Sequence, residues 1–213
     1  FTGANLSHAN LCGATNPVVK VYWPGGTYHE YRYLTFDFTD TDLSYADFDH
    51  AQMQDVVLTD AIVRYTNFHD ANLAGADLSY KDLTGTILTS ANLTGANLAG
   101  VDLSGKDLTG TILKGADLTD ATLPSISLSD KNFQRTVFDG LDLSGKDLSK
   151  SSLWDASFKN TNLENTNLRL ADFRAVDFTK IKNNSLAGAN LESASFLVAN
   201  LSGVNLSNVI LVG

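Results

Sequence analysis

The chain has 213 residues, with 15 Lys and Arg against 24 Asp and Glu and a net charge of −9. A domain-wide basic surface is absent, which argues against direct binding of nucleic acid, and no apolar run approaches the roughly 18 residues that a membrane span needs. Cys12 is the only cysteine, so an internal disulfide or a site of several cysteine metal ligands is excluded.

Residues 16–35 form a segment of distinct composition near the N-terminus. Two runs of β-forming residues, Val18–Trp23 and Thr27–Tyr33, flank the turn sequence Pro24-Gly25-Gly26. Short β-rich runs on both sides of such a turn are typical of a hairpin. The sequence therefore predicts an inserted β-hairpin or loop at 16–35.

A five-residue repeat occupies most of the remaining chain. Leu or Phe stands at every fifth residue from Phe38 to Phe178, with Met53 and Val63 as the only variants, which gives 29 units because 28 steps of five separate the two ends. A small residue stands two before this central position and Asp or Asn directly before it. Ser or Thr follows, then often Gly.

A period of five fits neither regular secondary structure. On a helix successive central residues would precess by about 140°, and on a strand they would alternate between opposite faces. A short extended piece followed by a turn in each unit places every central residue on the inside. The pattern therefore predicts a solenoid that turns a corner every five residues.

Residues 90–110, SANLTGANLAGVDLSGKDLTG, show the pattern most plainly. Here the chain resembles the pentapeptide-repeat family, whose motif is A(D/N)LxG. The resemblance implies an all-β fold, a right-handed quadrilateral parallel β-helix with four repeat units in each coil. At roughly 4.8 Å between stacked strands the 29 units would make about seven coils and about 35 Å. We expect Phe138, Phe158 and Phe178 to stack, and likewise Phe48 and Phe68.

Acidic residues concentrate at residues 36–79, where nine Asp face Arg64 alone for a net charge of −8. This stretch should span about 11 Å of coils, over which B-DNA carries about six charges. Asp also suits outward turn positions, so the charge has a structural explanation as well. The predicted partner-binding residues are Asp37, Asp40, Asp42, Asp47, Asp49, Asp60 and Asp77, with the outward-facing Tyr45 and Tyr65.

Two His–Asp combinations are separated by four repeat units, Asp49 with His69 and His50 with Asp70, and should meet on adjacent coils. They predict either exposed ion pairs worth about 0–1 kcal/mol, which we favour, or a weak metal site or pH-sensitive patch. Motifs such as HExxH, CxxC and the phosphate-binding GxxxxGK[ST] loop are absent. We expect no enzymatic activity, no cofactor and no resident metal.

Four lysines occupy the position of the small residue: Lys81, Lys106, Lys131 and Lys146. An unpaired buried ammonium is costly. Either the amines extend past the corner into solvent, or they donate to neighbouring hydroxyls and carbonyls. A line of cations that marks a partner groove is the third alternative.

The repeat changes phase at residues 181–185 and resumes at Leu186, shifted by three, which predicts a bulged corner within a single solenoid domain spanning 1–213. Phe1 lies in the central register without a preceding Met, so we expect a processed chain or part of a longer one. Exposed apolar residues near the C-terminus predict either a homodimer through that end or a missing cap. They are Leu197, Val198, Ile210, Leu211 and Val212.

These observations predict a non-enzymatic protein-interaction scaffold. The alternative follows from the resemblance, because topoisomerase-protection members of the family are acidic DNA mimics that occupy the DNA-binding surface of a type II topoisomerase. In that case the protein would bind DNA gyrase and protect it against quinolones or gyrase toxins. No secretory segment is visible, which leaves the compartment open and favours a soluble, cytoplasmic protein over an exported one.

Overall fold

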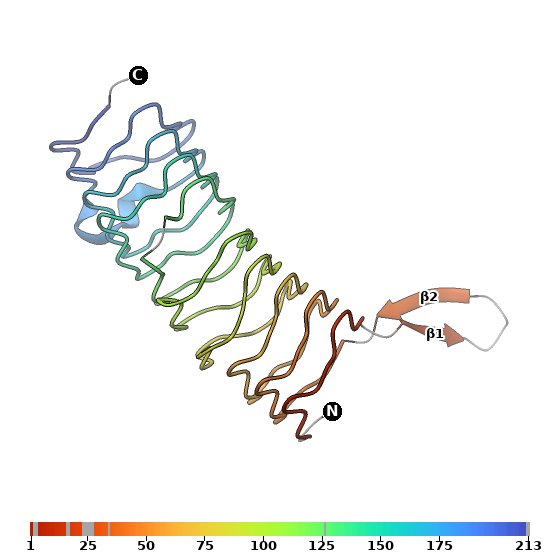
Figure 1. The fold of residues 1–213 in the computed structure, drawn as a ribbon. Coiled ribbons are helices and arrows are strands. Elements are labelled where there is room, and N and C mark those ends of the chain that lie inside the picture. The colour runs from red at the N-terminus through yellow and green to blue at the C-terminus, as the bar shows by residue number, and fades with distance from the viewer. Residues whose placement is uncertain (2–3, 16–17, 23–27, 34, 126, 212–213) are drawn as a thin grey trace. The chain divides into compact units, whose positions relative to one another are not determined.

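The computed structural model describes residues 1, 4–15, 18–22, 28–33, 35–125 and 127–211. In most units one extended residue before the central position is followed by a two-residue turn. Parallel bridges join many of these residues to their counterparts four units later, as Asp47 with Asn67 and Asp142 with Asn162. Four five-residue units therefore complete one coil, and the predicted right-handed β-helix is confirmed (Figure 1).

Each five-residue unit repeats one set of hydrogen bonds. The N–H of the central Phe48 donates to the carbonyl of Asn67 in the next coil (2.8 Å), and the N–H of Asn67 donates to Ala46 (2.9 Å). The carbonyl of Phe48 also accepts the N–H of Ala51 at 3.0 Å, which closes the corner. In the Asp or Asn slot a side-chain oxygen accepts the N–H two residues on, as Asn67 does from His69 at 3.0 Å. The period of five thus combines one extended residue with one closed turn.

The central residues form the core in stacked ladders. The rings of Phe138 and Phe158 lie 5.2 Å apart between centroids, and those of Phe158 and Phe178 lie 6.3 Å apart. Phe48 and Phe68 stack at 5.5 Å. All five side chains are at most 1% exposed. Both predicted ladders are confirmed, because each full coil returns a central side chain to its predecessor four units earlier.

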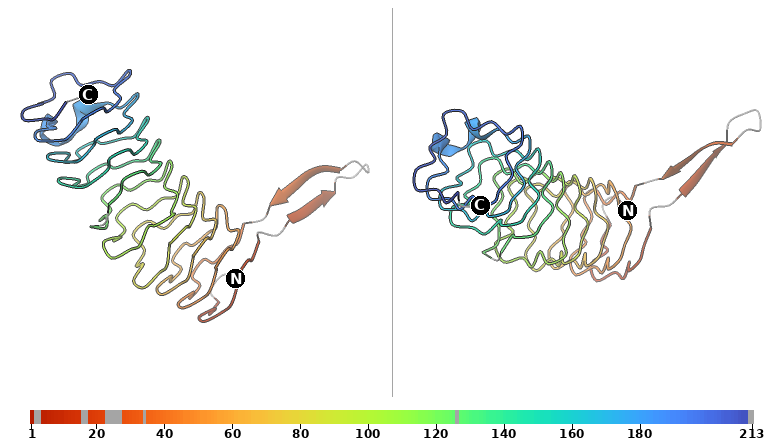
Figure 2. Two further views of the ribbon diagram at one scale, coloured as in Figure 1. Left: turned by 45° about the horizontal axis from the view of Figure 1, so that its top comes forward. Right: turned by 90° about the horizontal axis from the view of Figure 1, so that it is seen from above.

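Contacts between residues divide the chain into two compact units, which we describe separately. Unit 1 comprises residues 1–77, 81–93 and 107–111, and unit 2 comprises residues 78–80, 94–106 and 112–213. Figure 2 shows coils stacked within both parts of the chain. The expectation of a single domain stays a prediction.

Unit 1 contains the predicted hairpin. β1 (Val18–Tyr22) pairs antiparallel with β2 (Tyr28–Tyr33). Residues 23–27, which hold the predicted Pro-Gly turn, lie outside the described residues. Asn5 bridges directly to Asp42, across the whole hairpin, as regular coils bridge across four units. The coil therefore continues in register after the hairpin.

Unit 2 contains the phase change. Asn167 bridges to Asn190 and not to Ala187, which a regular coil would place beside it. Two single-turn 3-10 helices occupy the corner, η1 (Phe178–Lys180) and η2 (Lys182–Asn184). The additional chain is therefore accommodated in a second tight turn. None of the described helices is long and apolar enough to span a membrane.

Candidate functional site

Seven Asp residues of unit 1 form what we call the acidic surface. None of their side chains is buried. Most of these Asp residues occupy one of two positions in the repeat unit. One is the slot directly before the central residue, and the other is the corner slot two residues after the central residue. The members are Asp37, Asp40, Asp42, Asp47, Asp49, Asp60 and Asp77.

Hydrogen bonds favour the ionised form of two carboxylates of the acidic surface. Asp37 accepts the N–H of Thr39 at 2.9 Å, and Asp42 accepts that of Ser44 at 2.9 Å. The N–H and hydroxyl of Thr39 lower the pKa of Asp37, and the hydroxyl and N–H of Ser44 lower the pKa of Asp42, since these hydrogen bonds favour the charged form. Asp37 and Asp42 therefore each fix a turn and present a negative charge at the same time.

A ladder of exposed rings follows one corner of unit 1. The ring of His8 lies 4.9 Å from Tyr45, and Tyr45 lies 4.7 Å from Tyr65 with an angle of 2° between the rings. The two tyrosines are 51% and 46% exposed. Stacking of Tyr45 on Tyr65 is confirmed. The tyrosines add an aromatic edge beside the acidic surface, and Tyr is enriched at protein interfaces.

The His–Asp residues form a cluster with partly different partners from those predicted. His50 bridges two carboxylates, Asp49 at 2.7 Å and Asp70 at 3.4 Å. His69 lies 3.5 Å from Asp70, and its Nδ1 lies 2.7 Å from the hydroxyl of Thr89. The predicted contact of His50 with Asp70 is confirmed, whereas the predicted pairing of Asp49 with His69 is wrong because each side chain turns to a nearer partner. Among the described residues no group of three or more His, Cys, Asp and Glu could hold a metal ion.

The four interior-register lysines are half-buried. Lys81 Nζ donates to the carbonyl of Ala61 at 3.2 Å, and Lys146 Nζ donates to the carbonyl of Pro124 at 3.1 Å. Burial lowers the pKa of Lys81. For these two residues, donation to carbonyls is confirmed, so their amines stabilise the corner.

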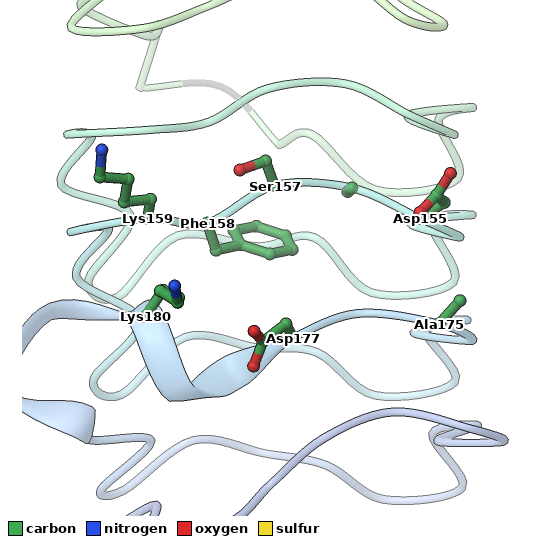
Figure 3. A pocket seen from close by; sticks show the side chains of 8 residues that line it. Asp155, Ser157, Phe158, Lys159, Ala175, Asp177 and Lys180 are labelled. Carbon is green, nitrogen blue, oxygen red and sulfur yellow. The ribbon is translucent and has the colours of Figure 1, made fainter.

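A hollow of about 370 Å³ opens on one side of unit 2, where sequence reasoning placed no site. Figure 3 shows Lys159 and Lys180 on one flank and Asp155 on the other, with Ser157 and Asp177 between them. The sequence pattern did not mark it, because the slots of Lys159 and Lys180 hold basic residues in other units as well, as at Lys114 and Lys150.

The predicted dimer residues that the structure describes are exposed. Leu197 and Val198 are 68% and 80% exposed, and Ile210 and Leu211 are 48% and 59% exposed. Val212 lies outside the described residues. Pairing of two chains through this end stays a prediction.

The family model of pentapeptide repeats matches residues 36–60, 66–105, 116–155, 155–182 and 181–213, in eight copies. The chain belongs to the pentapeptide-repeat family. Pentapeptide repeats therefore build the repeat scaffold described above. No curated protein matches the chain.

Solved structures similar to this pentapeptide-repeat chain include HetL, a protein involved in regulation of heterocyst differentiation in the cyanobacterium Nostoc sp. strain PCC 7120. The two are 23% identical over 99% of this chain and 88% of HetL, with a TM-score of 0.41. The plasmid-mediated fluoroquinolone resistance protein QnrB1, trypsin-treated, is 16% identical over 99% of this chain and 87% of its own, with a TM-score of 0.46. A pentapeptide-repeat protein of the Arabidopsis thaliana thylakoid lumen is 31% identical over 57% and 69% of the two chains, with a TM-score of 0.17.

Proposed function

We propose that this protein is a non-enzymatic interaction scaffold whose acidic surface binds a basic surface of a protein partner. The observation that carries the proposal is the choice of Asp over Asn in unit 1. Both residues can accept the turn hydrogen bond and both tolerate the left-handed corner, so the fold alone does not require a carboxylate.

The C-terminal part of unit 2, residues 150–213, supplies the comparison. Asn162 accepts the N–H of Glu164 at 3.2 Å, and Asn160 holds a corner at φ 58°. Residues 150–213 contain ten Asn and three Asp, whereas residues 36–79 contain two Asn and nine Asp. Since the amide serves the same slots without charge, the aspartates of unit 1 supply a property beyond folding.

The collective charge suits attraction of a basic partner. Like charges on one surface raise the local potential and accelerate association with an oppositely charged partner. Tyr45 and Tyr65 add rigid contact area beside the charge, at exposed positions held by stacking. The acidic surface would guide the partner and the tyrosines would provide contact after docking.

Exchange of four carboxylates for amides tests the location of this surface. Asp→Asn removes charge and retains the turn acceptor, so the fold should persist. Loss of four exposed charge contacts predicts roughly tenfold or weaker binding to a poly-L-lysine-coated sensor in low salt, because each contributes up to about 1 kcal/mol. The substitutions are Asp42→Asn, Asp47→Asn, Asp49→Asn and Asp60→Asn.

A matched variant of unit 2 changes the net charge by the same amount. It should bind poly-L-lysine nearly as well as the unmodified chain, and binding of both should weaken as salt screens the charges. Equal losses in the two variants would contradict the proposal, because net charge and not the acidic surface would then govern binding. The control substitutions are Asp120→Asn, Asp139→Asn, Asp142→Asn and Asp147→Asn.

Mimicry of DNA is the second candidate, favoured by charge density. Nine Asp over about 11 Å exceed the roughly six phosphates of B-DNA over that length. A DNA-binding groove of a type II topoisomerase would then be the basic partner. Micromolar protein should inhibit supercoiling by DNA gyrase, and the unit 1 amide variant should not. Full supercoiling activity with the unmodified protein would refute this candidate while leaving the broader proposal intact.

A further inference from the structure

The hollow of unit 2 separates hydrogen-bond donors from acceptors. Lys159 and Lys180 stand on one flank, and each ammonium offers three donors and no acceptor. Among the described residues neither amine lies within 4.0 Å of a carboxylate. This flank therefore presents two positive charges to whatever enters the hollow.

The polar side chains on the floor of the hollow offer acceptors. Ser157 donates its hydroxyl hydrogen to Asp139 at 2.6 Å, and a hydroxyl has a single hydrogen. Its oxygen lone pairs remain for a ligand. Asp177 accepts both the N–H and the hydroxyl of Thr179 at 3.0 and 2.7 Å, which lowers the pKa of Asp177 and keeps it charged.

The opposite flank is also acidic. Asp155 lines it, and its only ion pair among the described residues is with exposed Arg135, at 3.6 Å. A simple anion would meet two lysines and, close by, two carboxylates. A simple cation would meet two carboxylates and, close by, two lysines. The arrangement suits a ligand that carries both charges.

We propose that this hollow binds a small dipolar ligand, an α-amino acid, with its carboxylate at Lys159 and Lys180 and its ammonium directed to Ser157 and Asp177, which lie beside the lysines (Figure 3). The hollow of about 370 Å³ lies within the size range of small-molecule sites. The proposal is independent of the acidic surface, because all its residues belong to unit 2.

Titration of the isotope-labelled protein with three ligands tests the pairing of charges. L-alanine should shift the backbone amide signals of Ser157, Lys159 and Lys180. These shifts should saturate below about 100 mM alanine, as expected for a dissociation constant in the range of ~1 mM. Propionate lacks the ammonium, and glycine betaine keeps the positive charge without N–H donors. Both should bind at least about tenfold more weakly than alanine.

The double variant Lys159→Gln and Lys180→Gln should lose saturation by alanine. Lys150→Gln is the matched control, because Lys150 is an exposed lysine of unit 2 that lies 4.0 Å from Asp130, outside the lining of the hollow. This control should bind alanine unchanged. Absence of saturable shifts with alanine would overturn the proposal. Equal affinity for propionate would reduce the hollow to an anion site, and equal affinity for betaine would remove the role of the acceptors.

Discussion

At the scale of single residues, the corner position two after each central residue has the strictest backbone requirement. Its φ is positive in most units, from 51° at Asp70 to 79° at Gly140. A left-handed conformation costs an ordinary residue roughly 1–2 kcal/mol. Tyr45 and Tyr65 nevertheless occupy it, at φ 61° and 59°. These tyrosines therefore retain a strained backbone, as do Leu170 and Val198 at the same position of other units.

Gly85 and Gly95 separate the two costs of filling such a corner. Both have nearly the same φ, +68° and +66°, but a Cβ at Gly85 would overlap the ring of Tyr65 whereas one at Gly95 meets nothing within 4 Å. Gly85→Ala should therefore lower the free energy of unfolding by about 1 kcal/mol more than Gly95→Ala, which carries only the left-handed strain. Urea denaturation of both variants measures this difference. Equal losses would show that the Tyr65 ring yields freely and that the ladder is loose.

At the scale of elements, the phase change of unit 2 resembles an insertion into a regular unit. Without residues 182–184 the sequence would run FTKISL, with Ile181 in the small-residue slot and Ser185 in the extended slot before the central Leu186. Ile181 is already 3% exposed. The N–H of Lys182 now donates to the carbonyl of Thr161 at 2.9 Å, the bond that the extended slot makes in other coils.

Deletion of residues 182–184 should accordingly yield a folded protein. Ser185 would take over the bond to Thr161, and two left-handed residues, Asn183 and Asn184, would be removed. We expect the melting temperature to stay within a few degrees or to rise. Deletion of residues 161–163 is the control of equal length. It breaks the period of five, so cooperative melting should be lost or strongly shifted. Similar damage by both deletions would mean that η2 is a required element.

The sequence predicts best those contacts that the backbone positions directly. Contacts made by the ends of long side chains are harder to predict, because side-chain rotation decides them. The stacking of Phe138 on Phe158 and of Tyr45 on Tyr65 follows from the period together with the four units per coil that the family resemblance implies, because the backbone sets the spacing. The contacts of His50 with Asp49 and Asp70 depend on its side-chain conformation, which the period does not determine. The hollow at Lys159 depends on short neighbouring side chains and on the corner at η1 (Phe178–Lys180), so no local motif marks it.

At the scale of the whole molecule, the turn carboxylates make stability depend on pH in one direction. Hydrogen bonds from Ser44, Ser144 and Thr179 lower the pKa of Asp42, Asp142 and Asp177 below the ordinary 3.8. Protonation therefore favours the unfolded chain. The contribution of these groups to the free energy of unfolding is fully present from about one pH unit above 3.8. It is lost as the pH falls through their pKa values in the folded protein.

Thermal melts between about pH 6 and pH 2.5 measure this acid limb. These groups should leave the melting temperature constant near neutral pH. The melting temperature should then decrease once the pH is below about 4. The triple variant Asp42→Asn, Asp142→Asn and Asp177→Asn keeps the turn acceptors but does not titrate, so its melting temperature should fall less steeply. An identical slope would assign the acid limb to other groups.

The hairpin of unit 1 has a consequence for how such proteins acquire new surfaces. Asn5 still reaches Asp42 although the whole hairpin lies between them along the chain. A β-bridge between coils depends on the two residues that lie side by side, and the length of chain that separates them does not affect it. Corners are thus natural grafting points, at which foreign peptides can be displayed and new specificities can evolve while the hydrogen-bonded ladder beneath them is left unchanged.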